Sequence, residues 1–94
     1  MKNRLDLPAR LDHQGARQLY AALLSMPPGD TCLAAGQVSF VGGLALQLLL
    51  AAAAKWRAEG HQFTCQPMSP AFTDDVTRLG VDPKEFQEDQ GSCR

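Results

Sequence analysis

This sequence of 94 residues lacks the usual marks of a catalytic, metal-binding or nucleic-acid-binding protein. None of its three cysteines lies in a C-x-x-C arrangement, and neither histidine falls at ligand spacing from a cysteine pair, so no zinc site is predicted. No spacing of Ser, His, Asp and Cys predicts nucleophilic catalysis, and no glycine-rich cofactor fingerprint is present. The net charge of −1, with scattered Lys and Arg, excludes a basic footprint for nucleic acid. We therefore expect a protein that is not an enzyme and that binds neither cofactor nor nucleic acid.

Long hydrophobic runs are also missing. The N-terminus, residues 1–5, becomes charged at once and has no apolar core of a signal peptide. The longest apolar run, residues 44–54, contains Gln47 and is far shorter than the roughly 20 residues that span a bilayer. Three cysteines cannot all pair within one chain, and we interpret them as reduced thiols. These features predict a cytoplasmic protein without direct membrane insertion.

What the chain does contain is enough apolar sequence, 45%, for the core of one small domain. We place this domain at residues 1–83 and interpret residues 84–94 as a polar, flexible tail, in which Phe86 could still dock. The predicted strands are 5–7, 31–34, 38–41 and 61–66. Three helices are predicted. The first follows Asp12 and carries an apolar face of Ala16, Leu19, Tyr20, Leu23 and Leu24. The other two cover residues 43–59 and 69–80. This alternation predicts a small α/β fold with a mostly parallel sheet.

The most informative point is the glycine pair Gly42-Gly43, where a β-type run ends and a strongly apolar helix begins. A helix start presents free backbone N–H groups and the positive end of the helix dipole. Two interpretations remain open. The pair could form a partner or anion site, or it could be a tight turn needed only for chain reversal.

Five segments, taken in order, resemble the STAS domain of bacterial anti-sigma factor antagonists. They are Leu7–Asp12, Cys32–Ala35, Val38–Leu50, Gly60–Phe63 and Ser69–Val81. In that family a partner kinase, which is also the anti-sigma factor, phosphorylates a Ser or Thr preceded by Asp. Those two positions align with Gly42 and Gly43, so the resemblance implies that the acceptor hydroxyl is missing here. A Gly-Gly-Leu junction is similar to that of STAS-like proteins encoded with bacterial chemotaxis genes.

The resemblance implies a protein-binding role in signal transduction, with a partner of the anti-sigma kinase or chemotaxis histidine-kinase type. The implied binding surface comprises the turn at Asp12, the loop before the junction and the start of the following helix. Its residues are Asp12, Gln37, Ser39, Val41, Gly42, Gly43 and Leu44. Two alternatives stay open: a STAS-like subunit that packs on the ATPase of a phospholipid-transport ABC complex, and a small-molecule or nucleotide sensor.

Overall fold

The computed structural model describes residues 2–87, which form two small parallel sheets, three α-helices and one 3-10 helix. In chain order the elements are β1 (Lys2–Asp6), β2 (Arg10–Leu11), α1 (His13–Leu24), β3 (Asp30–Ala35), β4 (Phe40–Val41), α2 (Gly43–Ala58), β5 (Phe63–Met68), α3 (Pro70–Arg78) and η1 (Pro83–Phe86). The predicted α/β fold with parallel strands is confirmed.

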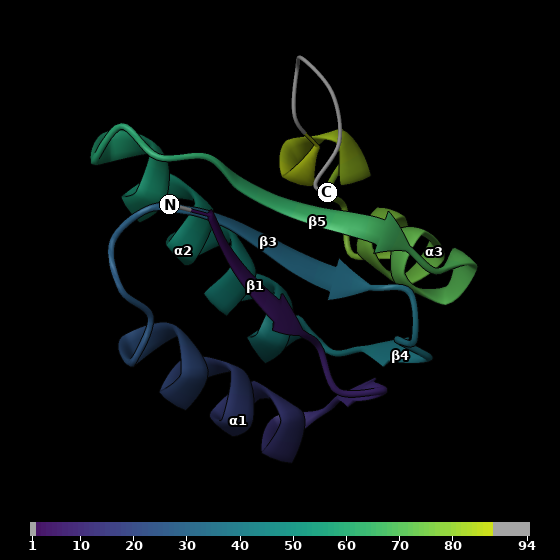
Figure 1. Ribbon diagram of the computed structural model, residues 1–94. Coiled ribbons are helices and arrows are strands. Elements are labelled where there is room, and N and C mark those ends of the chain that lie inside the picture. The colour runs from purple at the N-terminus through teal and green to yellow at the C-terminus, as the bar shows by residue number, and fades with distance from the viewer. Residues whose placement is uncertain (1, 88–94) are drawn as a thin grey trace.

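Both sheets are entirely parallel. The larger has the order β1-β3-β5, with Leu5 opposite Leu33 and Leu33 opposite Cys65. The smaller joins β2 to β4, with Leu11 opposite Val41. In Figure 1 the three long strands run in one direction, and β4 and α3 lie beyond their carboxyl ends. The glycine pair that follows β4 therefore lies at that end of the molecule.

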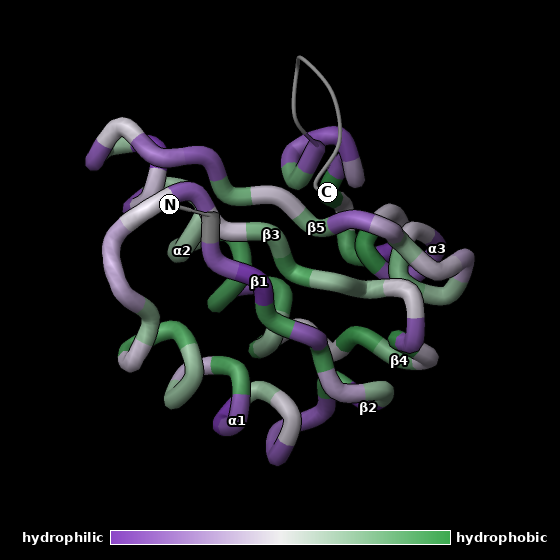
Figure 2. Tube along the Cα trace, in the orientation of Figure 1, coloured by the Kyte–Doolittle hydropathy of each residue, from purple (hydrophilic) through white to green (hydrophobic). Residues whose placement is uncertain are grey.

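Helices α1 and α2 cover one face of the larger sheet (Figure 1), and the core lies between them and the strands. Helix α2 is apolar around most of its circumference because it packs on both β5 and α1. Hydrophobic segments accordingly line this interior in Figure 2. Leu46 and Leu49 are buried, whereas Leu50 is only partly buried. No helix within residues 2–87 has the length and apolar character needed to cross a membrane.

The N-terminal third differs in detail from the sequence-based expectation. The first strand begins at Lys2, and the two-residue strand β2 was not predicted, because two residues leave no periodic signal. In α1 the buried residues are Gly15, Ala16 and Leu19, whereas Tyr20 and Leu24 are exposed. The apolar stripe is therefore narrower than the helical spacing suggested.

The described fold continues past residue 83. Residues 83–86 form η1, and Phe86 is fully buried with its ring edge-on to that of Phe72, 6.2 Å between centroids. Residues 88–94 of the predicted tail lie outside the described residues. Cys65 is a buried free thiol whose pKa is raised by burial. Cys32, however, is disulfide-bonded, so the expectation of reduced thiols is wrong at that position; Cys93 is outside the described residues.

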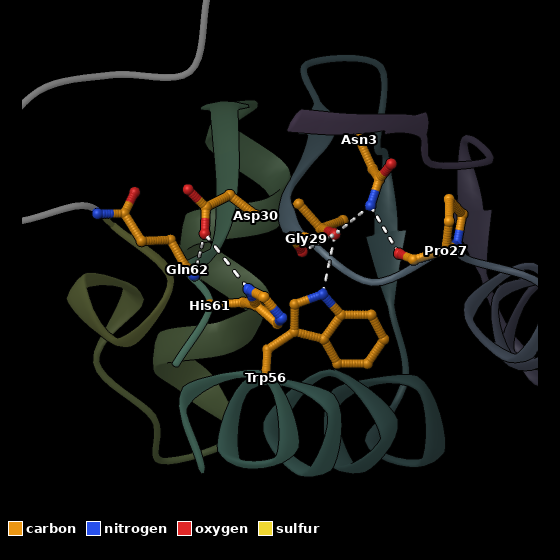
Figure 3. A network of polar contacts seen from close by, with 8 residues as sticks. Asn3, Pro27, Gly29, Asp30, Trp56, His61 and Gln62 are labelled. Atoms are coloured by element: carbon orange, nitrogen blue, oxygen red, sulfur yellow. Dashed lines mark hydrogen bonds and ion pairs between the residues drawn. The ribbon is translucent and has the colours of Figure 1, made fainter. Parts of the chain in front are cut away.

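At the amino ends of the strands, side chains form a dense polar network around Trp56 (Figure 3). The Trp56 indole Nε1–H donates to Thr31 Oγ1 at 2.9 Å, and the Thr31 hydroxyl donates to the carbonyl of Gly29 at 3.2 Å. Asn3 Nδ2 donates to the Pro27 carbonyl at 2.8 Å. Both Trp56 and Thr31 are buried, so the network ties the end of α2 to β3 and to the loop before it.

Candidate functional site

The pairing of β2 with β4 brings two predicted parts of the site together although they lie 30 residues apart. The Gly42 N–H donates to the carbonyl of Leu11 at 2.9 Å, directly before Asp12. The Ser39 N–H likewise donates to the Ala9 carbonyl at 2.7 Å. The turn at Asp12 and the glycine junction are therefore held side by side by main-chain hydrogen bonds.

Gly42 is the N-cap of α2 and has extended backbone angles, φ −92° and ψ 166°. As a glycine it offers no side-chain cap, and the first intrahelical bond of α2 is donated by the Leu46 N–H to the Gly42 carbonyl at 3.1 Å. The N–H groups of the first turn, from Gly43 to Ala45, therefore have no acceptor in a preceding helical turn. They face the end of the helix where the dipole is positive.

The two glycines differ in their surroundings. A Cβ on Gly42 would lie 3.2 Å from the Leu11 carbonyl oxygen and 3.5 Å from Cε2 of Phe40. A Cβ on Gly43 would meet no atom within 4 Å, and neither glycine has a positive φ. A side chain at position 42 would therefore press on the backbone of β2, whereas position 43 faces open space and tolerates a side chain.

The other predicted site residues near the junction differ in solvent exposure. Gln37, Ser39 and Leu44 are exposed, Leu44 by 45%. Val41 is 1% exposed and packs in the core, so its side chain supports the surface from beneath. The Ser39 hydroxyl donates to the Ala9 carbonyl at 3.1 Å and lies on the segment before β4, away from the helix start.

Asp12 is both the N-cap of α1 and part of this surface. Its Oδ1 accepts the Gly15 N–H at 2.9 Å, and its Oδ2 lies 3.6 Å from the Arg10 guanidinium. The hydrogen bond from Gly15, with Arg10 as a further contributor, holds the pKa of Asp12 below its usual value. Arg10 also lies over the Phe40 ring at 5.0 Å. The surface thus carries one fixed acidic and one basic group beside the bare helix start.

Sequence reasoning missed one residue that holds this surface in place. This residue is Asp75 of α3, whose side chain reaches across to β4. The Val41 N–H donates to Asp75 Oδ2 at 2.8 Å, and Asp75 is 8% exposed. A signal existed, because Asp75 falls three residues after Phe72 and one before Val76, on the apolar face of α3.

Helix α3 also holds the loop that precedes β4. The Ser69 hydroxyl donates to the Val38 carbonyl at 2.5 Å and accepts the Phe72 N–H at 3.0 Å. The Ser69 N–H donates to the Ala35 carbonyl at 3.0 Å. The helix predicted at 69–80 is thereby confirmed as α3, which Ser69 caps, and the loop of residues 36–39 is fixed from the side of α3.

No hydroxyl occupies position 42 or 43, and among residues 2–87 no group of three or more His, Cys, Asp or Glu side chains could hold a metal ion. The junction offers the main-chain N–H groups of the first turn of α2, the open position of Gly43, and flanking apolar and charged side chains.

A family model described as "Mlab, STAS domain" matches residues 2–86, nearly the whole chain. The protein belongs to the STAS domain family. Comparison with curated proteins and with solved structures gave no match. Membership of the family indicates a protein-interaction role. The resemblance inferred from five ordered segments is thus confirmed at the level of the family, and the association with chemotaxis stays a prediction.

Proposed function

We propose that this STAS domain is a non-enzymatic regulator that binds a protein kinase of the anti-sigma or chemotaxis histidine-kinase type in the cytoplasm. The proposed contact surface comprises the Asp12 turn, the exposed loop residues Gln37 and Ser39, and the start of α2. The observation that carries the proposal is the main-chain bond from Gly42 to Leu11, which unites these segments beside the open position of Gly43.

Binding at this surface is not switched by phosphorylation of the junction. Glycine at positions 42 and 43 has no acceptor oxygen, and the nearest hydroxyl, that of Ser39, is already bonded to the Ala9 carbonyl. Incubation with the purified kinase and ATP should leave the intact mass of the protein unchanged. A stoichiometric phosphate on Ser39 would contradict this part of the proposal.

The partner class is tested by affinity purification of the tagged protein from its native host, with mass spectrometry of the proteins recovered. Tagged Gly43→Glu is the matched control, because the added carboxylate changes the surface and leaves the core untouched. A serine or histidine kinase recovered with the parent, and depleted about tenfold with the control, is the expected result. Recovery of no kinase above the control level would overturn the proposal.

The second candidate is a STAS subunit of a phospholipid-transport ABC complex. It is favoured by the same missing hydroxyl, since a structural subunit on an ATPase needs no phosphate switch. Recovery of an ATPase with its permease would select this candidate. A third outcome, a phosphate-bearing small molecule at the N–H groups of Gly43, would make the domain a nucleotide or metabolite sensor.

A further inference from the structure

Asp75 is a buried carboxylate that contributes nothing to the exposed surface of the proposed site. It lies on the inward face of α3 between Phe72 and Val76, both of which are fully buried. Withdrawal of a carboxylate from water is costly unless hydrogen bonds or a counter-charge compensate it. Both compensations are present here, and they connect Asp75 to the glycine junction.

One oxygen of Asp75 binds the backbone immediately before the junction. Asp75 Oδ2 accepts the Val41 N–H at 2.8 Å, and Val41 is the residue before Gly42. On its other side this segment is tied to β2, through the Gly42 N–H and the Leu11 carbonyl. The short strand β4 is therefore held between two acceptors, one from β2 and one from α3.

The other oxygen of Asp75 is fixed by its own helix. Arg78 Nη1 lies 2.8 Å from Asp75 Oδ1, one turn along α3, and the Arg78 side chain is 63% exposed. A hydrogen bond to an ionised acceptor is stronger than one between neutral groups. The carboxylate is thus oriented by Arg78 and directs its free oxygen to Val41.

From these contacts we infer that Asp75 is a positioning residue: it sets the path of β4 into Gly42-Gly43 and thereby the affinity of the surface for its partner. The inference rests on the proposed function, because it assigns a role to Asp75 only through that surface. Ser69 fixes the other end of the same loop at Val38, so α3 as a whole determines where the glycine junction lies.

The experiment compares four variants by two-dimensional ¹H–¹⁵N NMR and by titration against the recombinant kinase recovered in the purification above. Asp75→Asn keeps an oxygen acceptor for Val41, whereas Asp75→Leu has similar size and no acceptor. Arg78→Gln removes the ion pair and leaves the bond to Val41. Val76→Ala is the stability control, because it removes buried apolar volume from the same helix face and leaves the Asp75 carboxylate and its bonds to Val41 and Arg78 in place.

The expected result is specific to the acceptor. Asp75→Leu should shift the amide signals of Val41, Gly42 and Gly43 and weaken binding about tenfold, while Asp75→Asn and Arg78→Gln stay within about threefold of the parent. Val76→Ala should lower the melting temperature and leave the signals of Gly42 and Gly43 in place. Equal affinity of folded Asp75→Leu and the parent would overturn the inference.

Two further measurements separate the possible failures. If Asp75→Leu does not fold, hydrogen exchange of the parent decides: the Val41 amide should be protected as strongly as that of Gly42, and unprotected exchange would overturn the inference. The proposed function is tested independently by Gly43→Glu in the same titration. If Gly43→Glu also binds like the parent, the surface itself is wrong, whereas a loss for Gly43→Glu alone refutes only the role of Asp75.

Discussion

The two ends of the larger sheet are stabilised in different ways. At the amino ends of the strands, side chains take part in the bonds: the Trp56 indole donates to the Thr31 hydroxyl at 2.9 Å, and the Asp30 carboxylate accepts the main-chain N–H of Gln62 at 2.8 Å. At the carboxyl ends the chain presents Gly42 and Gly43, and the bonds that fix them come from the backbone of β2 and from Asp75 of α3. Figures 1 and 3 show these two regions.

Under the proposed function, the carboxyl end serves recognition and the amino end serves stability. Glycine at positions 42 and 43 leaves main-chain donors and space uncovered at the carboxyl end. The stability that such a bare end lacks has to be supplied elsewhere. Here the buried Trp56, whose ring meets that of Phe63 edge-on at 5.4 Å, and the leucines of α2 supply it.

Replacement of Trp56, at the amino ends of the strands, should have the largest effect on the stability of the domain. Trp56→Ala removes a large buried ring and its hydrogen bond, and we expect a loss of about 3–5 kcal/mol in the free energy of unfolding. Trp56→Phe, which keeps most of the ring and leaves Thr31 without the indole donor, should cost about 1–3 kcal/mol. Denaturant melts measure both values, and a loss below about 1 kcal/mol for Trp56→Ala would show that this end is not a stabilising region.

The core that both ends share is tested at Leu49. This side chain of α2 is fully buried, so Leu49→Ala should destabilise the domain by about 2–5 kcal/mol. The exposed Leu44 on the same helix is the matched control, and Leu44→Ala should change the free energy of unfolding by less than about 0.5 kcal/mol. Similar losses for the two variants in urea melts would mean that α2 packs differently.

The glycine pair should respond asymmetrically to a methyl group. In Gly42→Ala the new Cβ approaches the Leu11 carbonyl, so β2 and β4 have to shift, at a cost of about 1 kcal/mol or more. In Gly43→Ala the Cβ enters open space, and the stiffer unfolded chain should make the domain more stable by about 0.4–1 kcal/mol. Calorimetric melting of both variants checks the signs, and equal effects would contradict the difference between the two positions.

The smallest expected effect is on the pH dependence of the melting temperature. Because the folded pKa of Asp12 lies below that of an unfolded aspartate, its contribution is present above the ordinary aspartate pKa and is lost as the pH falls through the folded value. Asp12→Asn should therefore reduce the difference in melting temperature between neutral and strongly acidic solution. An unchanged difference would show that the capping carboxylate of α1 does not act in this way.

Much of the fold follows from local sequence signals. The sequence contains the helix breakers Pro27, Pro28 and Gly29, a Ser69-Pro70 pair typical of a helix start, and the long apolar run of α2, and such local signals account for the alternation of strands and helices. What could not be predicted depends on contacts between distant segments. The two-residue strands have no period of their own, and the exposure of Tyr20 is decided by how α1 lies on the sheet.

The candidate site also depends partly on local sequence signals and partly on contacts between distant segments. The Gly42-Gly43 junction was visible as a β run that meets a helix, but its pairing with the segment before Asp12 arises only from the β2–β4 register. The role of Asp75 was missed because its neighbour Asp74, which is exposed, made the pair resemble ordinary surface charge. A carboxylate within an apolar stripe is the pattern that distinguishes the two.

The most direct test of the account is the affinity of Gly43→Glu for the recombinant kinase, measured by isothermal titration beside Gly43→Ser. The glutamate adds bulk and an unpaired charge that the partner has to desolvate, while the positive end of α2 tolerates it. We expect a folded Gly43→Glu that binds at least about tenfold more weakly, or about 1.4 kcal/mol, and a Gly43→Ser that binds like the parent. Parental affinity in a Gly43→Glu that circular dichroism shows to be folded would mean that the junction is only a turn and that the partner binds elsewhere.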